Sequence, residues 1–222
     1  LPVNKYAFLF YFVPLSEAQP MQGALEHSYS SLYYLPEYPQ EALLPFIIDV
    51  AAHEFFHIVT PLNLHSEEIH YFNFTQPKMS QHLWLYEGST EYAASHVQVQ
   101  YGLLNQDDYF DKLRNKIVNT TRHFNDTLPF TELSKGSLDK YKDQYQNVYE
   151  KGALISMCLD IKLLAASQGK YSLRNLIADL SKKYGKDRPF KDEDLFAEII
   201  AMTNPDIGRF ITRHIAGKEP LP

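Results

Sequence analysis

Disulfide bonds cannot staple this protein, because its 222 residues include a single cysteine, Cys158. That excludes the small disulfide-rich secreted scaffolds and leaves the cellular compartment open, and we expect Cys158 to be a buried thiol. Long apolar runs are missing as well: none reaches the roughly 18 residues that a membrane-spanning helix needs, so we expect no membrane span. Positive charge is scarce, with 21 Lys and Arg against 27 Asp and Glu. The formal charge of -6 argues against a nucleic-acid partner.

Apolar residues make up 45% of the sequence, which is enough for a substantial core and excludes a disordered or collagen-like chain. The first part favours strands, at 6–13 and 24–34, joined by a turn-rich connector at 14–23. From residue 39 the apolar periodicity becomes helical. Because strands come first and helices later, the pattern predicts an α+β fold. The predicted helices are 41–60, 83–101, 106–122, 148–167, 172–184, 192–203 and 206–216.

Two long stretches, 61–82 and 124–145, show no regular periodicity. Long loops in a compact domain tend to border a functional site, but ordered surface connections would have the same composition. Both interpretations stay open. We expect the histidines of the first stretch, His65, His70 and His82, to lie on the surface or to line a cleft and not to bind a metal.

Residues 45–60 of the helix predicted at 41–60 are apolar on nearly all sides, so we expect this helix to be buried. Yet it carries His53, Glu54 and His57. A buried carboxylate needs compensation, and a bound cation supplies it. At positions i and i+4, the two imidazoles share one helix face and can converge on one metal ion. Glu54 points to the flank, where it could take a proton from water. Asp49, one turn before His53, could support that histidine. The alternative is a pair of core histidines capped by a buried glutamate.

A catalytic zinc ion requires a third protein ligand. The metzincin continuation of the motif fails, because Thr60 and Asn63 stand where it needs glycine and histidine. A glutamate from a second helix is the other solution, and Glu87 in HLWLYEGSTEY provides it. Glu91, one turn later on the same face, could accept a hydrogen bond from a metal-binding histidine. The alternative for this segment is an ordinary acidic face in contact with solvent.

The order of these motifs resembles a known family. HEFFH, followed after 29 residues by the glutamate of LWLYEG, is similar to the PDZ-associated glycyl aminopeptidases, gluzincin metallopeptidases related to aminopeptidase N. GALEH at 23–27 resembles the strand motif whose glutamate, here Glu26, binds the free α-amine of the substrate. NVYEKGAL at 147–154 resembles the motif whose tyrosine, here Tyr149, stabilises the oxyanion. Together the motifs span residues 23 to 154, and the helical tail also resembles the end of the family's domain.

The resemblance implies a thermolysin-like gluzincin catalytic domain, with a short N-terminal antiparallel sheet followed by a mostly helical lobe. It implies one Zn²⁺ ion bound by His53, His57 and Glu87, with Glu54 as the general base. It also implies a peptide substrate. In the full-length protein it implies an additional N-terminal β domain and a C-terminal PDZ domain.

The sequence departs from the family in two places. After HEFFH the family continues with tryptophan and a basic stretch, whereas this chain has IVTPLNLHSEEIHYFNF. His27 stands where aminopeptidase N has asparagine, although histidine is common there in the glycyl branch. Because the first segment should border the leaving-group side, the substrate preference stays open.

We therefore expect residues 1–222 to form a single metallopeptidase catalytic domain, with a strand-rich substrate-edge part at 1–38 and a helical zinc-binding part at 39–222. The chain starts at Leu1 without methionine and stops at GKEPLP, so we expect a domain excised from a longer protein. The predicted function is a zinc-dependent aminopeptidase that acts on small N-terminal residues such as Gly or Ala. The alternatives are a zinc endopeptidase on the same scaffold and a non-catalytic, zinc-stabilised peptide-binding module.

Overall fold

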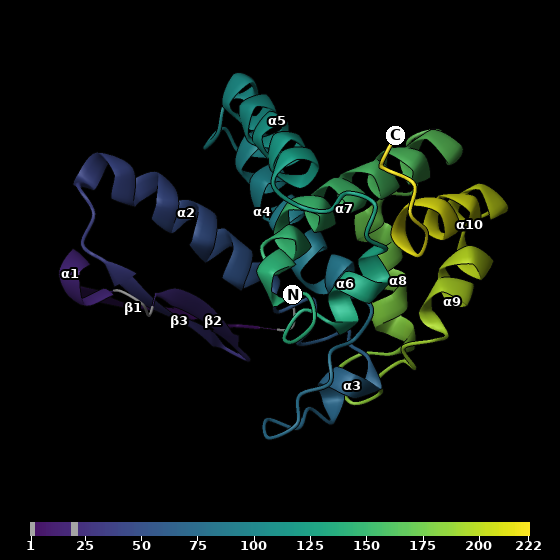
Figure 1. Cartoon of the computed structure of the whole chain (residues 1–222), viewed down its shortest axis with the longest axis horizontal. Coiled ribbons are helices and arrows are strands. Elements are labelled where there is room, and N and C mark those ends of the chain that lie inside the picture. The colour runs from purple at the N-terminus through teal and green to yellow at the C-terminus, as the bar shows by residue number, and fades with distance from the viewer. Residues whose placement is uncertain (1–2, 19–21) are drawn as a thin grey trace.

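The structure, a computed structural model, describes residues 3–18 and 22–222 of the chain. A small sheet and the long helix α2 form one side of the molecule, and the remaining helices form a larger body beside them (Figure 1). The predicted α+β class is confirmed. No helix within the described ranges is both long enough and apolar enough to cross a bilayer.

The sheet has three strands, β1 (Ala7–Val13), β2 (Gly23–His27) and β3 (Ser30–Pro36), in the order β1-β3-β2. The strand predicted at 24–34 is thus a hairpin of two antiparallel strands, β2 and β3. The sheet is mixed and not purely antiparallel, because β1 runs parallel to β3. After β1 the chain crosses to the opposite edge of the sheet, where it forms β2. The turn after β2 then places β3 between the other two strands, antiparallel to β2 and parallel to β1. Part of the predicted connector forms α1 (Leu15–Ala18), and residues 19–21 lie outside the described residues.

Aromatic side chains join the sheet to α2 (Gln40–Phe56). The fully buried ring of Tyr33 stacks on Phe10 at 4.3 Å, and Phe8 packs against Phe55 of α2 at 6.2 Å between centroids. Since alternate residues of a strand face the same side, and Glu26 of β2 pairs with Ser31 of β3, Glu26 shares this α2-facing side with Tyr33. The register of the hairpin therefore aims Glu26 toward the helix and away from the outer face.

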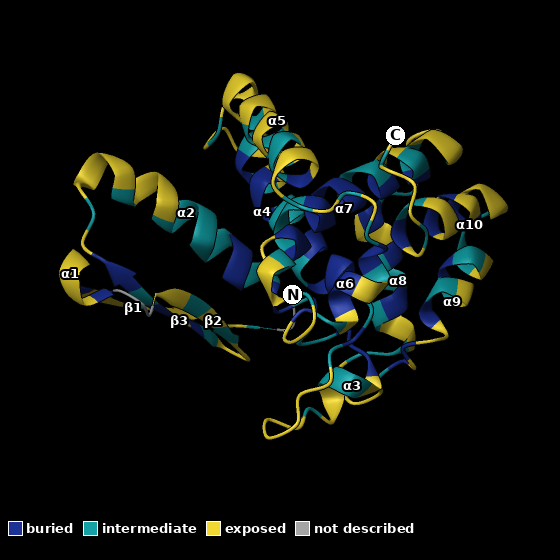
Figure 2. Ribbon diagram, in the orientation of Figure 1, coloured by how far each residue is buried: buried dark blue, intermediate teal, exposed yellow. Residues whose placement is uncertain are grey.

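Helix α2 is buried only toward its C-terminal end (Figure 2). Leu44 and Phe46 in its first half are exposed, whereas His53 and Glu54 are each only 7% exposed. The prediction that this helix is buried throughout is therefore wrong for its first half, which extends beyond the helical body. The helix also ends at Phe56, four residues before the predicted end, and the chain continues in turns. The chemically unusual residues sit at the one end of α2 that is buried.

Each predicted helical segment contains a helix. The irregular stretches hold three short helices that the periodicity missed, because elements of three to six residues show too few turns for a helical repeat. The remaining elements are α3 (Glu67–His70), η1 (Trp84–Gly88), α4 (Ser89–Gln100), α5 (Gln106–Arg122), α6 (Phe130–Lys135), η2 (Lys142–Gln144), α7 (Asn147–Ala166), α8 (Leu173–Lys183), α9 (Leu195–Met202), α10 (Pro205–Phe210) and η3 (Ile211–Ile215).

The core of the helical body forms where η1 crosses α7. Trp84, Leu85 and Tyr86 of η1 are almost completely buried, and η1 is a π-helical turn that leads directly into α4. At the crossing, Gly88 faces Gly152 so closely that a Cβ atom on Gly88 would lie 2.4 Å from the carbonyl carbon of Gly152. The two glycines therefore allow the two backbones to touch. This contact places the end of η1 beside the first turns of α7.

Candidate active site

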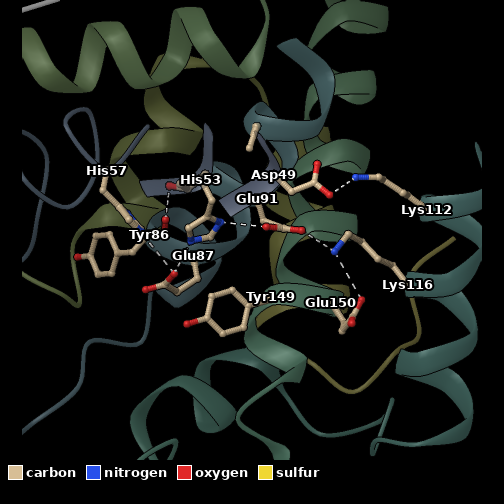
Figure 3. A network of polar contacts seen from close by, with 12 residues as sticks. Asp49, His53, His57, Tyr86, Glu87, Glu91, Lys112, Lys116, Tyr149 and Glu150 are labelled. Atoms are coloured by element: carbon tan, nitrogen blue, oxygen red, sulfur yellow. Dashed lines mark hydrogen bonds and ion pairs between the residues drawn. The ribbon is translucent and has the colours of Figure 1, made fainter. Parts of the chain in front are cut away.

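The three predicted metal ligands lie together (Figure 3). His53 and His57 come from the buried end of α2 and the turn after it, Glu87 comes from η1, and one ligand atom from each lies within 4.8 Å of the other two. Glu87 Oε2 is 3.2 Å from His53 Nε2 and 3.5 Å from His57 Nε2. Two imidazoles and one carboxylate at this spacing can hold a metal ion, and they match a common donor set of catalytic zinc.

Hydrogen bonds on the far side of each ring orient both histidines. His57 Nδ1 donates to the backbone carbonyl of Thr60 at 3.0 Å, and His53 Nδ1 lies 2.9 Å from Glu91 Oε2. With Nδ1 held in this way, the Nε2 atom of each ring is directed at Glu87. Glu91 thus lies where the sequence placed it. The role of the Thr60 carbonyl could not be predicted from the sequence, since every residue has a backbone carbonyl.

The site favours positive charge. Burial disfavours a charged His53 ring, but the carboxylates of Glu87 and Glu91 on its two nitrogens outweigh this effect and raise its pKa to about 10. Burial likewise acts against an ionised Glu91, yet His53 and Lys116 hold its pKa well below the usual range. Two ionised carboxylates around one imidazole are the electrostatic setting in which a cation binds.

Glu54 has a buried carboxylate oxygen that the described residues leave unsatisfied. Its Oε2 atom makes no hydrogen bond to any of them. Burial raises the pKa of Glu54, and the nearby rings of His57 and His53 offset this only in part. A buried acceptor without a donor costs about 1–3 kcal/mol, so such an atom is typical of a site that meets a ligand.

The side chain of Glu26, on strand β2, lies beside Glu54 and His57. Single ligand atoms of Glu26, Glu54 and His57 lie within 4.8 Å of one another, so a strand residue and two α2-end residues form a second group that overlaps the first. Strand β2 pairs only with β3 among the described residues, which makes it an edge strand. Glu26 therefore stands between an open sheet edge and the predicted metal ligands.

Tyr149, in the first turn of α7, faces this cluster. Its ring centroid is 5.7 Å from that of His53, and its hydroxyl is 3.3 Å from the hydroxyl of Tyr145. Burial and the negative charge of Glu87 raise the pKa of Tyr149, so its phenol stays protonated at neutral pH and remains a donor. Tyr145 was not predicted, because nothing in the sequence distinguishes it among 16 tyrosines.

Asp49 does not support His53. Its carboxylate accepts hydrogen bonds from Gln98 Nε2 at 2.9 Å and from Lys112, one turn of α2 away from the histidines. The interpretation of Asp49 as a partner of His53 is therefore wrong, and Lys112 with Asp49 forms a separate ion pair between α5 and α2.

Two histidines predicted at the surface or beside a cleft are buried. His65 Nδ1 donates to the carbonyl of Pro61, and the fully buried His82 contacts the carbonyl of Asp192 at 2.7 Å. His65 thus joins two parts of its own loop, and His82 joins the segment before η1 to the segment before α9. Both contacts depend on backbone carbonyls, which leave no motif in the sequence. Cys158, predicted to be buried, is only half-buried.

The fold has a known counterpart. The whole chain matches the crystal structure of an aminopeptidase N family protein from Idiomarina loihiensis with a TM-score of 0.86 and 23% sequence identity. The match covers 100% of this chain and 40% of that one, so the chain spans well under half the length of that protein. No curated protein shows a significant match to the sequence. This likeness shows that the chain is an α+β domain with the fold of part of that aminopeptidase N family protein.

Residues 47–155 match the family model of the M61 glycyl aminopeptidases. The matched segment contains His53, His57, Glu87, Glu91 and Tyr149. Residues 47–155 thus belong to the M61 glycyl aminopeptidase family of peptidases. The predicted resemblance to glycyl aminopeptidases is thereby confirmed.

Proposed function

We propose that this domain is a zinc-dependent aminopeptidase that hydrolyses the N-terminal bond of peptides and favours small first residues such as Gly or Ala. The observation that carries the proposal is the single cluster formed by His53, His57, Glu87 and the unsatisfied carboxylate of Glu54, with Glu26 at its sheet side. The preference for Gly or Ala is drawn from the family.

The donor set suits zinc. His53, His57 and Glu87 would hold the ion through two nitrogens and one oxygen, and the unsatisfied oxygen of Glu54 lies at the flank of that set. When bound, zinc supplies Lewis acidity, which polarises a carbonyl and lowers the pKa of water from 15.7 to about 7.

Three side chains of the protein carry the remaining steps. The Glu54 carboxylate removes a proton from the attacking water and delivers it to the departing amine, and its raised pKa suits both transfers. The protonated hydroxyl of Tyr149 donates a hydrogen bond to the oxyanion that develops on the attacked carbonyl. The Glu26 carboxylate binds the α-ammonium group of the peptide.

The position of Glu26 favours an aminopeptidase over an endopeptidase. A carboxylate this close to Glu54 would hold a terminal ammonium group at the end of an extended peptide that pairs with the β2 edge. The bond presented to Glu54 would then be the first one. The N-terminal β domain and C-terminal PDZ domain of a longer protein stay predictions.

Zinc removal tests the proposal. We expect one zinc ion per chain by atomic absorption, loss of glycyl- and alanyl-arylamide hydrolysis after treatment with a chelator, and recovery when zinc is restored. Equal activity of the zinc-free and zinc-loaded protein would contradict zinc dependence. Zinc binding without hydrolysis of any free-amine substrate would instead favour a peptide-binding module.

Glu26→Gln tests the amine-binding role. Loss of a hydrogen bond to a charged group costs about 1.5–3 kcal/mol, so kcat/KM for peptides with a free amine should fall about 10- to 100-fold. The slow reaction on N-acetylated analogues of the same peptides serves as the control and should not change. An equal loss on blocked and free peptides would remove Glu26 from amine recognition.

A further inference from the structure

Lys116 of α5 lies behind the candidate metal site. Its side chain is only 14% exposed, and its Nζ atom is 2.8 Å from Glu91 Oε1 and 3.6 Å from Glu150 Oε2. Figure 3 shows the Glu91 carboxylate between Lys116 and His53. Three helices meet at this amine, because Glu91 lies on α4 and Glu150 on α7.

Glu91 uses both of its oxygens. Oε2 contacts His53 Nδ1 at 2.9 Å, while Oε1 accepts a hydrogen bond from Lys116. Lys116 therefore holds the orientation of the Glu91 carboxylate, and that carboxylate in turn holds the His53 ring. Glu87 lies close enough to Glu91 for the two charges to repel, and Glu150 shares the Lys116 amine with Glu91. Without the lysine, repulsion among these carboxylates would favour rotation of Glu91 toward water, since its side chain is 26% exposed.

We propose that Lys116 is a positioning residue: through Glu91 it holds the His53 ring with the Nε2 lone pair directed at the metal site, and it thereby raises the affinity of the site for zinc. This inference rests on the zinc site of the proposed function. It does not involve contact between Lys116 and either the metal or the peptide.

A purely electrostatic role predicts the opposite sign. A positive charge close to a cation site repels the cation, so removal of Lys116 would strengthen zinc binding if charge alone mattered. If orientation matters more, removal weakens binding, because groups that orient a metal-binding histidine contribute about 10- to 100-fold to metal affinity. The direction of the change therefore separates the two roles.

The chain offers a matched control. Lys112 lies one turn earlier on the same helix and pairs with Asp49 of α2, yet neither residue contacts a member of the candidate site. Lys112→Met removes the same charge from the same helix and breaks the same kind of ion pair. Lys116→Arg, in contrast, keeps a donor that can reach the carboxylates.

The test measures zinc affinity by competition with a chromophoric chelator, and it measures the visible spectrum of the Co²⁺-substituted protein. For Lys116→Met we expect roughly tenfold weaker zinc binding and an altered Co²⁺ spectrum. Lys116→Arg and Lys112→Met should stay within about twofold of the wild type. Thermal unfolding of the zinc-free variants checks the fold, and Lys116→Gln takes the place of the Met variant if the latter does not fold.

Zinc binding by Lys116→Met that equals or exceeds that of the wild type would overturn the inference. Equal weakening by Lys112→Met would overturn it too, since helix packing or general charge would then explain the effect. A wild-type protein that binds no zinc would contradict the proposed function itself, whereas a zinc-binding wild type with an unaffected Lys116→Met variant would contradict only this inference.

Discussion

Glu54→Gln should lower kcat for free-amine peptides by about 100- to 10,000-fold, the range typical for loss of a general base. Glutamine has nearly the same shape as glutamate but cannot accept a proton from water at neutral pH. Because Glu54 is not one of the three proposed zinc ligands, the variant should still bind one zinc ion. Its stability should not fall either, since the change removes a buried carboxylate whose Oε2 atom has no partner among the described residues.

Steady-state kinetics on glycyl- and alanyl-arylamides, with zinc content determined on the same samples, measures this effect. Glu41→Gln is the matched control, because Glu41 lies in the exposed first turn of the same helix, far along α2 from Glu54. The control should keep full activity. Turnover by Glu54→Gln within tenfold of the wild type would exclude Glu54 as the general base.

Gly88→Ala should produce the largest change in stability. The added Cβ would lie 2.4 Å from the carbonyl carbon and 2.5 Å from the carbonyl oxygen of Gly152, and neither backbone atom can move independently of its helix. Overpacking of this kind costs about 3 kcal/mol, which corresponds to a fall in Tm of about 6–12 °C for a domain of this size. Activity should fall as well, because η1 carries Glu87 and α7 carries Tyr149.

Thermal and denaturant unfolding measure the loss. Gly23→Ala is the control, since a Cβ atom at Gly23 would meet nothing within 4 Å, and its Tm should change little. The double variant Gly88→Ala with Gly152→Ala should lose less than the sum of the two single losses, because both substitutions push apart the same pair of elements. A stable Gly88→Ala variant would mean that the two backbones can separate at little cost.

The predictable part of the site was local in sequence. His53 and His57 are one helical turn apart, so helix geometry alone brings them together, and Glu91 follows Glu87 by the same spacing. In contrast, the spacing along the chain does not predict how close the histidine pair lies to the glutamate pair in space. That distance depends on how η1 packs on α7 and how α4 packs on α2. The motif resemblance, not the periodicity, supplied that link.

The unpredicted part depends on partners that carry no pattern. The backbone carbonyl of Thr60 orients His57. Lys116 resembles the other lysines and arginines in sequence, and only the packing of α5 against α4 brings it to Glu91. The parallel pairing of β1 with β3 was missed for a related reason. Alternation along a strand shows which side chains share a face, but it does not show with which strand it pairs or in which direction.

The wide turn at Trp84–Gly88 has a consequence for how this domain can change. A π-helical turn holds one residue more than the regular helix that follows it. Deletion of a single residue there would restore ordinary helical geometry and swing the carboxylate of Glu87 by about 100° around the axis. The acid would then face another side of the helix, so the length of this turn, and not only its residues, determines where Glu87 lies.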